Sequence, residues 1–257
     1  MMSPSEFPRV NILGHGVCAI TLTDAVEILE GWIARREGTR YVCCADVNVI
    51  MSGRRDPALR WLYNRAGLLT PDGMPLVWLC RLAGETQTRR VYGPDLMRAL
   101  CGRGHRHYFY GTTDATLTNL ADRLRQQNPQ IAIAGMDAPP YRDLTAQEDA
   151  AAVEKINASQ ADVVWVGLGS PKQDRWMAAH VDRLNAPVLI GVGAAFDFIA
   201  GIKPQAPVWM QRNGLEWLFR LSTEPRRLWK RYSQNIPAFV TLSLLQRFRL
   251  RQFPTEQ

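Results

Sequence analysis

The stretch Val163-Val-Trp-Val-Gly-Leu-Gly-Ser-Pro-Lys-Gln173 decides the fold class of this 257-residue chain. Its first four residues are a continuous apolar run of strand length, and the glycines behind them predict a tight turn. Pro171 is typical of a first helical turn, where its fixed φ suits the helix and its missing N–H is not needed. We therefore predict a buried strand, a glycine turn and a helix that carries Trp176 and Met177.

The same order of elements recurs along the chain. Apolar runs of strand length occupy residues 41–45, 107–110 and 187–192. A helical pattern follows Thr23, and the segment Gly111-Thr-Thr-Asp114 is expected to cap another helix. Continuous apolar strands that alternate with helices are typical of a parallel sheet covered on both faces. The predicted fold class is therefore α/β, with a mostly parallel sheet and helices on both faces.

The net charge of +7 has a definite location. Residues 203–257 hold ten Lys/Arg against three Asp/Glu, so residues 1–202 carry 21 of each sign. Pro204 and Pro207 interrupt the chain at this point, and the segment behind them has helical propensity and is rich in Trp and Arg. We predict a neutral core over residues 1–202 and a basic helical appendage over residues 203–257.

Several protein classes are disfavoured by composition. Hydrophobic residues make up 46% of the chain and charged ones 21%, which is ordinary for a globular protein. The five cysteines form no paired CxxC set, so we expect reduced core cysteines in a cytosolic protein. The first ten residues lack a signal-peptide pattern, and the apolar run 187–202 is broken by Asp197 and too short to span a bilayer. A soluble or peripheral protein is expected.

Three predicted strand ends carry glycine turns: 111–114, 167–173 and 191–197. Helix N-termini at such turns direct backbone N–H groups outward and favour phosphate. Each turn taken alone is explained by local geometry, but three in one sheet favour a nucleotide or diphosphate site. None is a dinucleotide fingerprint, because Phe196 stands where a small residue is needed.

The chemistry of such a site would depend on an acid and on fixed cations. Thr70-Pro-Asp-Gly73 is most often a simple turn, but an aspartate on a strand-end loop can act as a general base in a suitable environment. The chain has no Asp-x-Asp and no His pair at metal spacing, so no metal site is predicted, and His105 and His107 are interpreted as surface or core residues. Arginine would then be the suitable partner for a diphosphate.

The basic appendage allows three interpretations. Its cations interleave with Trp217 and Trp229, which makes a merely solvated helix face less suitable. A basic, aromatic, amphipathic helix is typical of an anionic membrane interface, and nucleic acid is the competing polyanion. The cations are Arg220, Arg226, Arg227, Lys230 and Arg231.

Five ordered segments resemble the WecG/TagA/CpsF family of glycosyltransferases (glycosyltransferase family 26), over roughly residues 10–232. They are Pro71-Asp-Gly-Met-Pro-Leu-Val-Trp78, Arg90-Val-Tyr-Gly-Pro-Asp-Leu96, Val166-Gly-Leu-Gly-Ser-Pro-Lys-Gln-Asp174, Gly191-Val-Gly-Ala-Ala-Phe-Asp-Phe198, and Gly214-Leu-Glu-Trp-Leu-Phe-Arg220 through Glu224-Pro-Arg-Arg227.

The resemblance implies a Rossmann-like core and an inverting, metal-independent transferase without a cofactor. Its donor would be a UDP-sugar: UDP-N-acetylmannosamine, its uronic acid, or UDP-glucose. Its acceptor would be a polyprenyl-diphosphate-linked saccharide of cell-surface or exopolysaccharide biosynthesis. The appendage would seat the enzyme on the inner face of the cytoplasmic membrane and complete the active site. A monomer and a homo-oligomer both stay open.

The predicted site residues fall into three groups. Asp72 is the implied base, and Arg220 and Arg227 would stabilise the leaving diphosphate. Arg226, Lys230 and Arg231 would face the diphosphate or the membrane. The residues predicted to bind the nucleotide-sugar are Asp46, Asn48, Gly111, Gly169, Ser170, Lys172, Gln173, Gly193 and Asp197.

One departure from the family pattern concerns the predicted sugar site. Many members have Thr-x-Asn where this chain reads Cys44-Ala-Asp-Val-Asn48. A carboxylate at Asp46 only accepts hydrogen bonds, so the sugar preference is expected to differ.

Two other classes are weighed against the transferase. A nicotinamide-dependent oxidoreductase would need the glycine fingerprint that the chain lacks. A nucleic-acid-binding module would use the basic appendage but would leave the three glycine turns unexplained. We expect no nucleic-acid partner.

Overall fold

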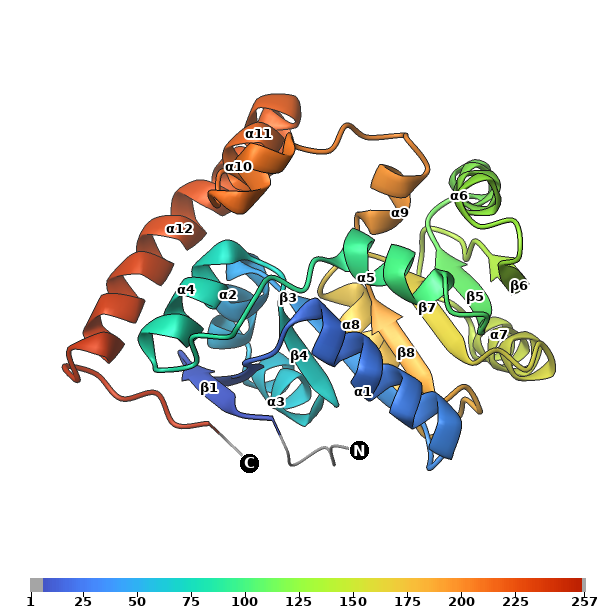
Figure 1. Cartoon of the computed structure of the whole chain (residues 1–257), viewed down its shortest axis with the longest axis horizontal. Coiled ribbons are helices and arrows are strands. Elements are labelled where there is room, and N and C mark those ends of the chain that lie inside the picture. Colours follow the sequence, from blue (N-terminus) through green and yellow to red (C-terminus); the bar gives the residue numbers. More distant parts are fainter. Residues whose placement is uncertain (1–6, 256–257) are drawn as a thin grey trace.

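The computed structural model describes residues 7–255, and its centre is a six-stranded sheet in the order β4-β3-β8-β7-β5-β6. Every pairing within this sheet is parallel (Figure 1). Its strands are β3 (Arg40–Ala45), β4 (Leu68–Pro71), β5 (Arg106–Gly111), β6 (Ala132–Asp137), β7 (Val163–Gly167) and β8 (Val188–Gly191).

Helices cover both faces of the sheet, which confirms the predicted α/β, Rossmann-like class. Trp165 of β7 packs toward one face, and its neighbours Val164 and Val166 pack toward the other. The first face carries α1 (Leu22–Arg35), α5 (Gly93–Cys101), α6 (Asp114–Gln127) and α9 (Ala195–Ile199). The second carries α2 (Val47–Arg55), α3 (Pro57–Arg65), α4 (Met74–Leu82), α7 (Ala146–Ala158) and α8 (Lys172–His180).

Local signals place most of these elements where the sequence predicts them. The strand over 163–167 is confirmed, and a helix follows it as predicted, but this helix begins at Lys172, so that Pro171 is its N-cap and not part of its first turn. Helix α1 begins two residues earlier than expected, because the Thr21 side chain caps it by accepting from the backbone of Asp24. Strand β4 reads as a turn in sequence, since it ends in Pro71; an edge strand tolerates proline because its outer side needs no N–H.

A separate antiparallel hairpin lies beside the edge strand β4. It consists of β1 (Arg9–Ile12) and β2 (His15–Cys18), and β2 packs against β4. No sequence pattern predicts this hairpin. Its four-residue strands are short, and the apolar alternation across them is too brief to distinguish from a loop.

The cysteines and histidines lie as expected of core residues. All five cysteines are free, and all but Cys44 are buried. His107 is buried and accepts a hydrogen bond from Trp165 Nε1 at 3.1 Å. Within residues 7–255 no group of three or more His, Cys, Asp or Glu could hold a metal ion. Over the same residues, no helix has the length and apolar character needed to cross a membrane.

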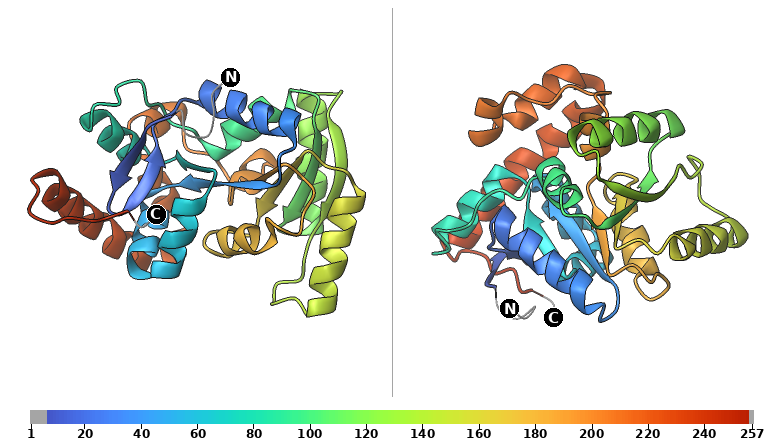
Figure 2. Two further views of the ribbon diagram at one scale, coloured as in Figure 1. Left: turned by 90° about the horizontal axis from the view of Figure 1, so that it is seen from below. Right: turned by 45° about the vertical axis from the view of Figure 1, so that its right-hand side comes forward.

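The basic segment forms three helices: α10 (Val208–Arg212), α11 (Glu216–Thr223) and α12 (Pro225–Arg247). Figures 1 and 2 show α10 and α11 at one end of the molecule, with α12 running back along its flank beside α4 and α2. Beyond α12, the carbonyl of Phe253 accepts from Asn11 Nδ2 at 2.7 Å, so this chain end is bonded to β1. The domain boundary near residue 202 stays a prediction.

Candidate active site

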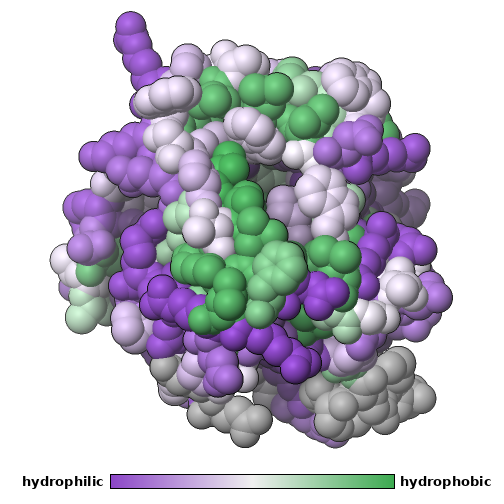
Figure 3. All heavy atoms as spheres, turned by 90° about the vertical axis from the view of Figure 1, so that its left-hand side faces the viewer, coloured by the Kyte–Doolittle hydropathy of each residue, from purple (hydrophilic) through white to green (hydrophobic). Residues whose placement is uncertain are grey.

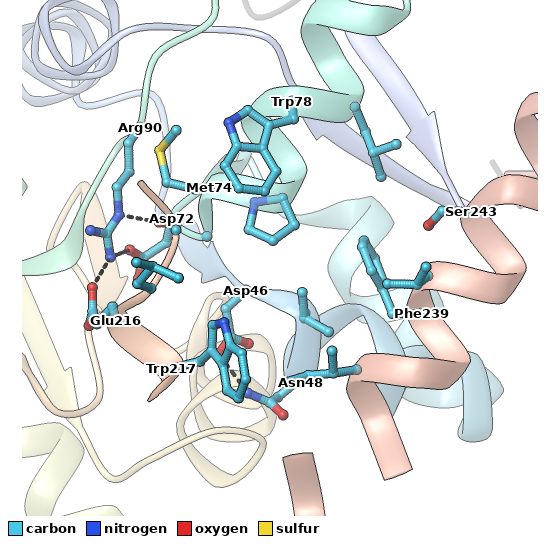
Figure 4. Close-up of a pocket in the computed structure, with 18 of the residues that line it drawn as sticks. Asp46, Asn48, Asp72, Met74, Trp78, Arg90, Glu216, Trp217, Phe239 and Ser243 are labelled. Atoms are coloured by element: carbon cyan, nitrogen blue, oxygen red, sulfur yellow. Dashed lines mark hydrogen bonds and ion pairs between the residues drawn. The ribbon is translucent and has the colours of Figure 1, made fainter. Parts of the chain in front are cut away.

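A cavity of about 530 Å³ lies between the core and the three C-terminal helices. This volume is within the range of ~300–1,000 Å³ typical of small-molecule sites. The core wall comes from the ends of β3 and β4, from α4 and from Arg90; the other wall comes from α10, α11 and α12. Figure 4 shows the charged groups Asp72, Arg90 and Glu216 together at one end, with Trp78 and Phe239 farther along.

Asp72 reaches this cavity because of the turn that follows β4. Its backbone N–H donates to the carbonyl of Ala45 at 2.9 Å, which ties the end of β4 to the end of β3. A Cβ added at Gly73 would lie 3.3 Å from Asp46 Cα, so the glycine allows the two strand ends to approach closely. The Pro-Asp-Gly segment is thus a turn, as its composition predicts, and it also presents the carboxylate to the cavity.

Arg90 joins Asp72 of the core to Glu216 of α11. Its Nη2 donates to Glu216 Oε2 at 2.6 Å and to Asp72 Oδ1 at 3.3 Å, and its Nε donates to the Asp72 carbonyl. The guanidinium lies 3.8 Å from the centre of the Tyr92 ring, and the Tyr92 hydroxyl donates to Glu216 Oε1. The three charged side chains are only 15–23% exposed, so two carboxylates share one largely buried cation.

This environment tunes the acidity of Asp72. Burial raises the pKa of Asp72 to about 7; Arg90 opposes the rise, and the charges of Glu216 and Asp46 add to it. A carboxyl group with a pKa near operating pH is well matched to accept a proton from a hydroxyl group. The role of Asp72 as a general base stays a prediction, and a raised pKa is the property that such a role requires.

Asp46 and Asn48 stand beside Asp72 and belong to a polar network. Asp46 caps α2 by accepting from the backbone N–H of Val49 at 2.9 Å, and its other oxygen accepts from Asn48 Nδ2 at 2.8 Å. Asn48 Oδ1 accepts from Asn235 of α12 at 2.9 Å, and Asn235 Oδ1 accepts from Arg55 at 2.8 Å. The network therefore links the cavity floor to α12.

Arg220 is the predicted leaving-group cation that lines the cavity. Its guanidinium lies 5.9 Å from the centre of the Phe198 ring, and within the described chain its buried Nε has no hydrogen-bond partner. Burial opposes the charged form, but neighbouring acidic groups, Asp46 and Glu216 among them, outweigh it and raise the pKa of Arg220. Arg220 thus stays protonated and has a donor available to a ligand.

The predicted glycine turns lie at the ends of three adjacent strands, outside this cavity. Gly111 ends β5, Gly169 follows β7 and Gly193 follows β8. The buried Gln173 ties two of these turns together, because its Oε1 accepts from the backbone N–H of Gly169 at 3.1 Å and of Gly193 at 3.0 Å. The structure assigns Gln173 a positioning contact within the protein.

The remaining predicted nucleotide-binding side chains are not gathered at one point. Ser170 donates to the buried carboxylate of Asp174. Lys172 lines a second cavity, of about 430 Å³, between α8 and the segment 139–149. Asp197 forms an ion pair with Lys203 at 2.8 Å.

The other predicted cations of α12 do not line the larger cavity. Arg227 is 51% exposed, and its Nε donates to Glu224 at 2.6 Å. Arg226 and Lys230 are exposed, whereas Arg231 is half-buried and lies over the Tyr232 ring. Of the predicted cations, Arg220 alone joins the group around Asp72.

Sequence reasoning did not assign a role to Arg90 or Glu216. Each had a signal available. Arg90 opens one of the five family-like segments, and Glu216 is one of only three acids in the basic appendage. A rare acid in a strongly cationic segment indicates a specific partner, here the guanidinium of Arg90.

The sequence matches a known protein family and named relatives. The model of the glycosyl transferase WecG/TagA/CpsF family matches residues 10–253. A Bacillus spizizenii protein named N-acetylglucosaminyldiphosphoundecaprenol N-acetyl-beta-D-mannosaminyltransferase is 29% identical over 227 residues, which cover 87% of this chain and 86% of that protein. A Staphylococcus aureus protein of the same name is 26% identical over 243 residues, 92% of each chain. This chain, with its aspartate and paired arginine at the ends of a parallel sheet, therefore belongs to the WecG/TagA/CpsF family of glycosyltransferases.

Proposed function

We propose that this protein transfers an N-acetylmannosamine-type sugar from its UDP derivative to a polyprenyl-diphosphate-linked saccharide. The names of the relatives support the sugar and the lipid-linked acceptor, and these relatives align with 87–92% of the chain. The uronic acid of the same sugar and glucose are the other donors to compare. The observation that carries the proposal is the largely buried Asp72, with a pKa of about 7, in a cavity that also contains Arg220.

The proposed reaction is a single displacement. Asp72 accepts the proton of an acceptor hydroxyl while that oxygen forms a bond to the anomeric carbon of the donor. The bond from the anomeric carbon to the UDP oxygen breaks, and its electron pair leaves with the diphosphate. One displacement inverts the configuration at the anomeric carbon. Arg220 stabilises the charge that grows on the diphosphate, in place of a metal ion.

Arg90 and Glu216 position and tune the base. Arg90 fixes Asp72 through both its backbone carbonyl and its carboxylate, while Glu216 shares the guanidinium and so limits its pull on the Asp72 proton. The pKa of the base thus depends on a residue of the core and on a residue of α11.

The glycine turns are the proposed place for the nucleotide. They lie side by side at the ends of β5, β7 and β8, and β8 neighbours β3, which leads to Asp46. Helices α6 and α8 begin there with outward N–H groups suited to phosphate. A donor laid along this edge would direct its sugar toward Asp46, Asn48 and Asp72.

We further propose that the enzyme is peripheral on the inner face of the cytoplasmic membrane. The exposed cations Arg226 and Lys230 lie next to Trp229, which is 65% exposed, and this combination suits an anionic lipid interface. Arg231 would contribute to the same face. Family membership supports neither an oxidoreductase nor a nucleic-acid-binding module.

The test is a panel of UDP-sugars with a short-chain lipid-diphosphate acceptor carrying N-acetylglucosamine, read by product mass. With the accepted donor, we expect Asp72→Asn to lower kcat by about 10²–10⁴-fold, because the amide cannot take up the proton. The donor affinity of this variant should stay within about threefold of the wild-type value, because the substitution leaves the binding of the donor in its ground state unaffected.

The control is Asp95→Asn, which removes an aspartate that is 51% exposed and lies outside the cavity. It should retain full turnover. Near-native turnover of Asp72→Asn with the donor still bound would contradict the assignment of Asp72 as the base.

A further inference from the structure

One end of the cavity is apolar, whereas the charged groups lie at the other end. Trp78, Leu79 and Leu82 of α4 line one side, and Ile236, Val240 and Leu244 of α12 line the other; we call these six residues the apolar groove. The residues at 236, 240 and 244 are four apart, so they form one stripe of α12 that faces α4. Figure 3 shows apolar side chains gathered on this face of the molecule.

The apolar groove has no protein segment covering it within residues 7–255. Trp78, Leu82, Val240 and Leu244 are 43–60% exposed. Contiguous apolar surface left open to water is unusual for a soluble protein and marks a binding surface.

We propose that the apolar groove holds the first isoprene units of the lipid-linked acceptor, an inference that rests on the proposed function. The groove and the charged end form one continuous cavity. The acceptor has the matching construction, with a sugar on one side of its diphosphate and a hydrocarbon chain on the other. When its hydroxyl contacts Asp72, the chain extends along α4.

The length of α4 agrees with this placement. The helix begins at Met74, directly behind Asp72 and Gly73, and Leu82 is eight residues farther on. At 1.5 Å per residue, Leu82 lies about 12 Å along the axis from Met74. The sugar and diphosphate fill the near part of this span, and hydrocarbon meets Trp78, Leu82 and the stripe of α12.

The far end of the groove leads to a surface suited to a bilayer. Arg247 lines the cavity there, one turn beyond Leu244. Phe248 and Leu250 follow in the sequence and are 69% and 73% exposed. They alternate there with Arg249 and Arg251. A cavity of about 530 Å³ accommodates the head group and the first isoprene units, so the rest of the chain stays in the membrane.

The test compares farnesyl diphosphate with isopentenyl diphosphate by calorimetry, without vesicles and below micellar concentrations. The two probes share a diphosphate and differ in chain length. We expect the wild-type protein to bind farnesyl diphosphate at least about 100-fold more tightly, because the longer chain buries more apolar surface. This measurement needs no variant, no donor and no turnover. The binding preference can therefore be absent while the transfer assay succeeds, and it can be present while the transfer assay fails.

A matched pair of double variants locates the effect. Leu82→Gln with Leu244→Gln should reduce the preference to less than about tenfold. Ile202→Gln with Leu218→Gln makes a closely similar chemical change at residues that are 51% and 46% exposed and do not line the cavity; it should keep the preference.

Four results would overturn the proposal. The first is equal affinity of the wild-type protein for both probes, and the second is an unchanged preference in the groove variant. The third is equally tight binding of a lysophospholipid, which would assign the groove to membrane acyl chains. The fourth is a dimer that forms in the wild-type protein and is lost in the groove variant, as measured by sedimentation of the same samples. It would assign the groove to a second copy of the chain.

Discussion

At the scale of single residues, the proton affinity of Asp72 is the property on which the proposed chemistry depends. An aspartate in water is ionised well below pH 7, so burial and two neighbouring carboxylates are needed to bring its pKa to about 7. The base is the deprotonated form. Activity should therefore rise with pH through a limb centred near pH 7.

Glu216→Gln tests the source of this tuning. Removing the Glu216 charge removes one contribution that raises the pKa of Asp72 and also leaves Arg90 to pair with Asp72 alone. Both changes lower that pKa. We expect the acid limb of kcat/KM against pH to move to lower pH by about one pH unit.

The control for this variant is Glu224→Gln, which neutralises another acid of the same segment. Glu224 pairs with Arg227 and does not line the cavity. Its acid limb should coincide with that of the wild type. An unmoved limb in Glu216→Gln would show that Glu216 does not set the proton affinity of the base.

The arginines of the basic segment differ in what surrounds them, and their variants should differ accordingly. Arg220 lines the cavity with a donor unused by the protein, whereas Arg227 bonds to Glu224 at the surface. We expect Arg220→Ala to lower kcat/KM by about 10²–10³-fold. Arg227→Ala should cost less than about tenfold, measured with the same donor and acceptor. If both variants lost kcat/KM equally, Arg227 would be assigned a role beside the diphosphate, as the sequence predicts.

At the scale of elements, the strands of the sheet centre were predictable because they are continuous apolar runs. Residues 163–166 and 188–191 are buried on both faces and are therefore apolar throughout. Strand β6 was not predicted, since all six of its residues are only half-buried at the sheet edge and include Ala and Gly. Apolar runs locate buried strands and miss edge strands.

The candidate site was predictable only in part, for a related reason. Asp72, Asp46 and Asn48 follow strands, so sequence order alone brings them to one end of the sheet. Arg90 contacts Glu216, which is 126 positions away in the sequence. Asn48 contacts Asn235, which is 187 positions away. No local pattern encodes such pairs, because they depend on how α11 and α12 return to the core.

At the scale of the whole molecule, charge and apolar surface are divided between two parts of the chain. The core is neutral, and the last 55 residues carry the entire surplus of positive charge. The same segment exposes large apolar side chains, among them Trp209 and Trp229 at 60% and 65%. In the proposed function, these features would direct one side of the enzyme toward an anionic bilayer.

Sedimentation with anionic vesicles tests this orientation. We expect Arg226→Glu with Lys230→Glu to weaken vesicle binding by at least about tenfold at physiological salt, because each cation near the surface contributes about 1 kcal/mol. Raising the salt should reduce the difference from wild type. Activity on a water-soluble acceptor should stay unchanged, since neither residue lines the cavity.

The matched control reverses two cations of the core, Arg103→Glu with Arg125→Glu, each 55% exposed. It changes the net charge by the same amount and should retain vesicle binding. Equal weakening by both pairs would mean that total charge, and not the basic segment, governs attraction to the membrane.

The crossing of the basic segment over α4 depends on a glycine. Gly214 has a φ of +69°, and a Cβ added there would lie 2.6 Å from Cη2 of Trp78. Two residues later Glu216 meets Arg90. The C-terminal segment is therefore not an interchangeable module: grafting it onto another family member, or another segment onto this core, succeeds only if the recipient supplies matching partners at positions 78 and 90.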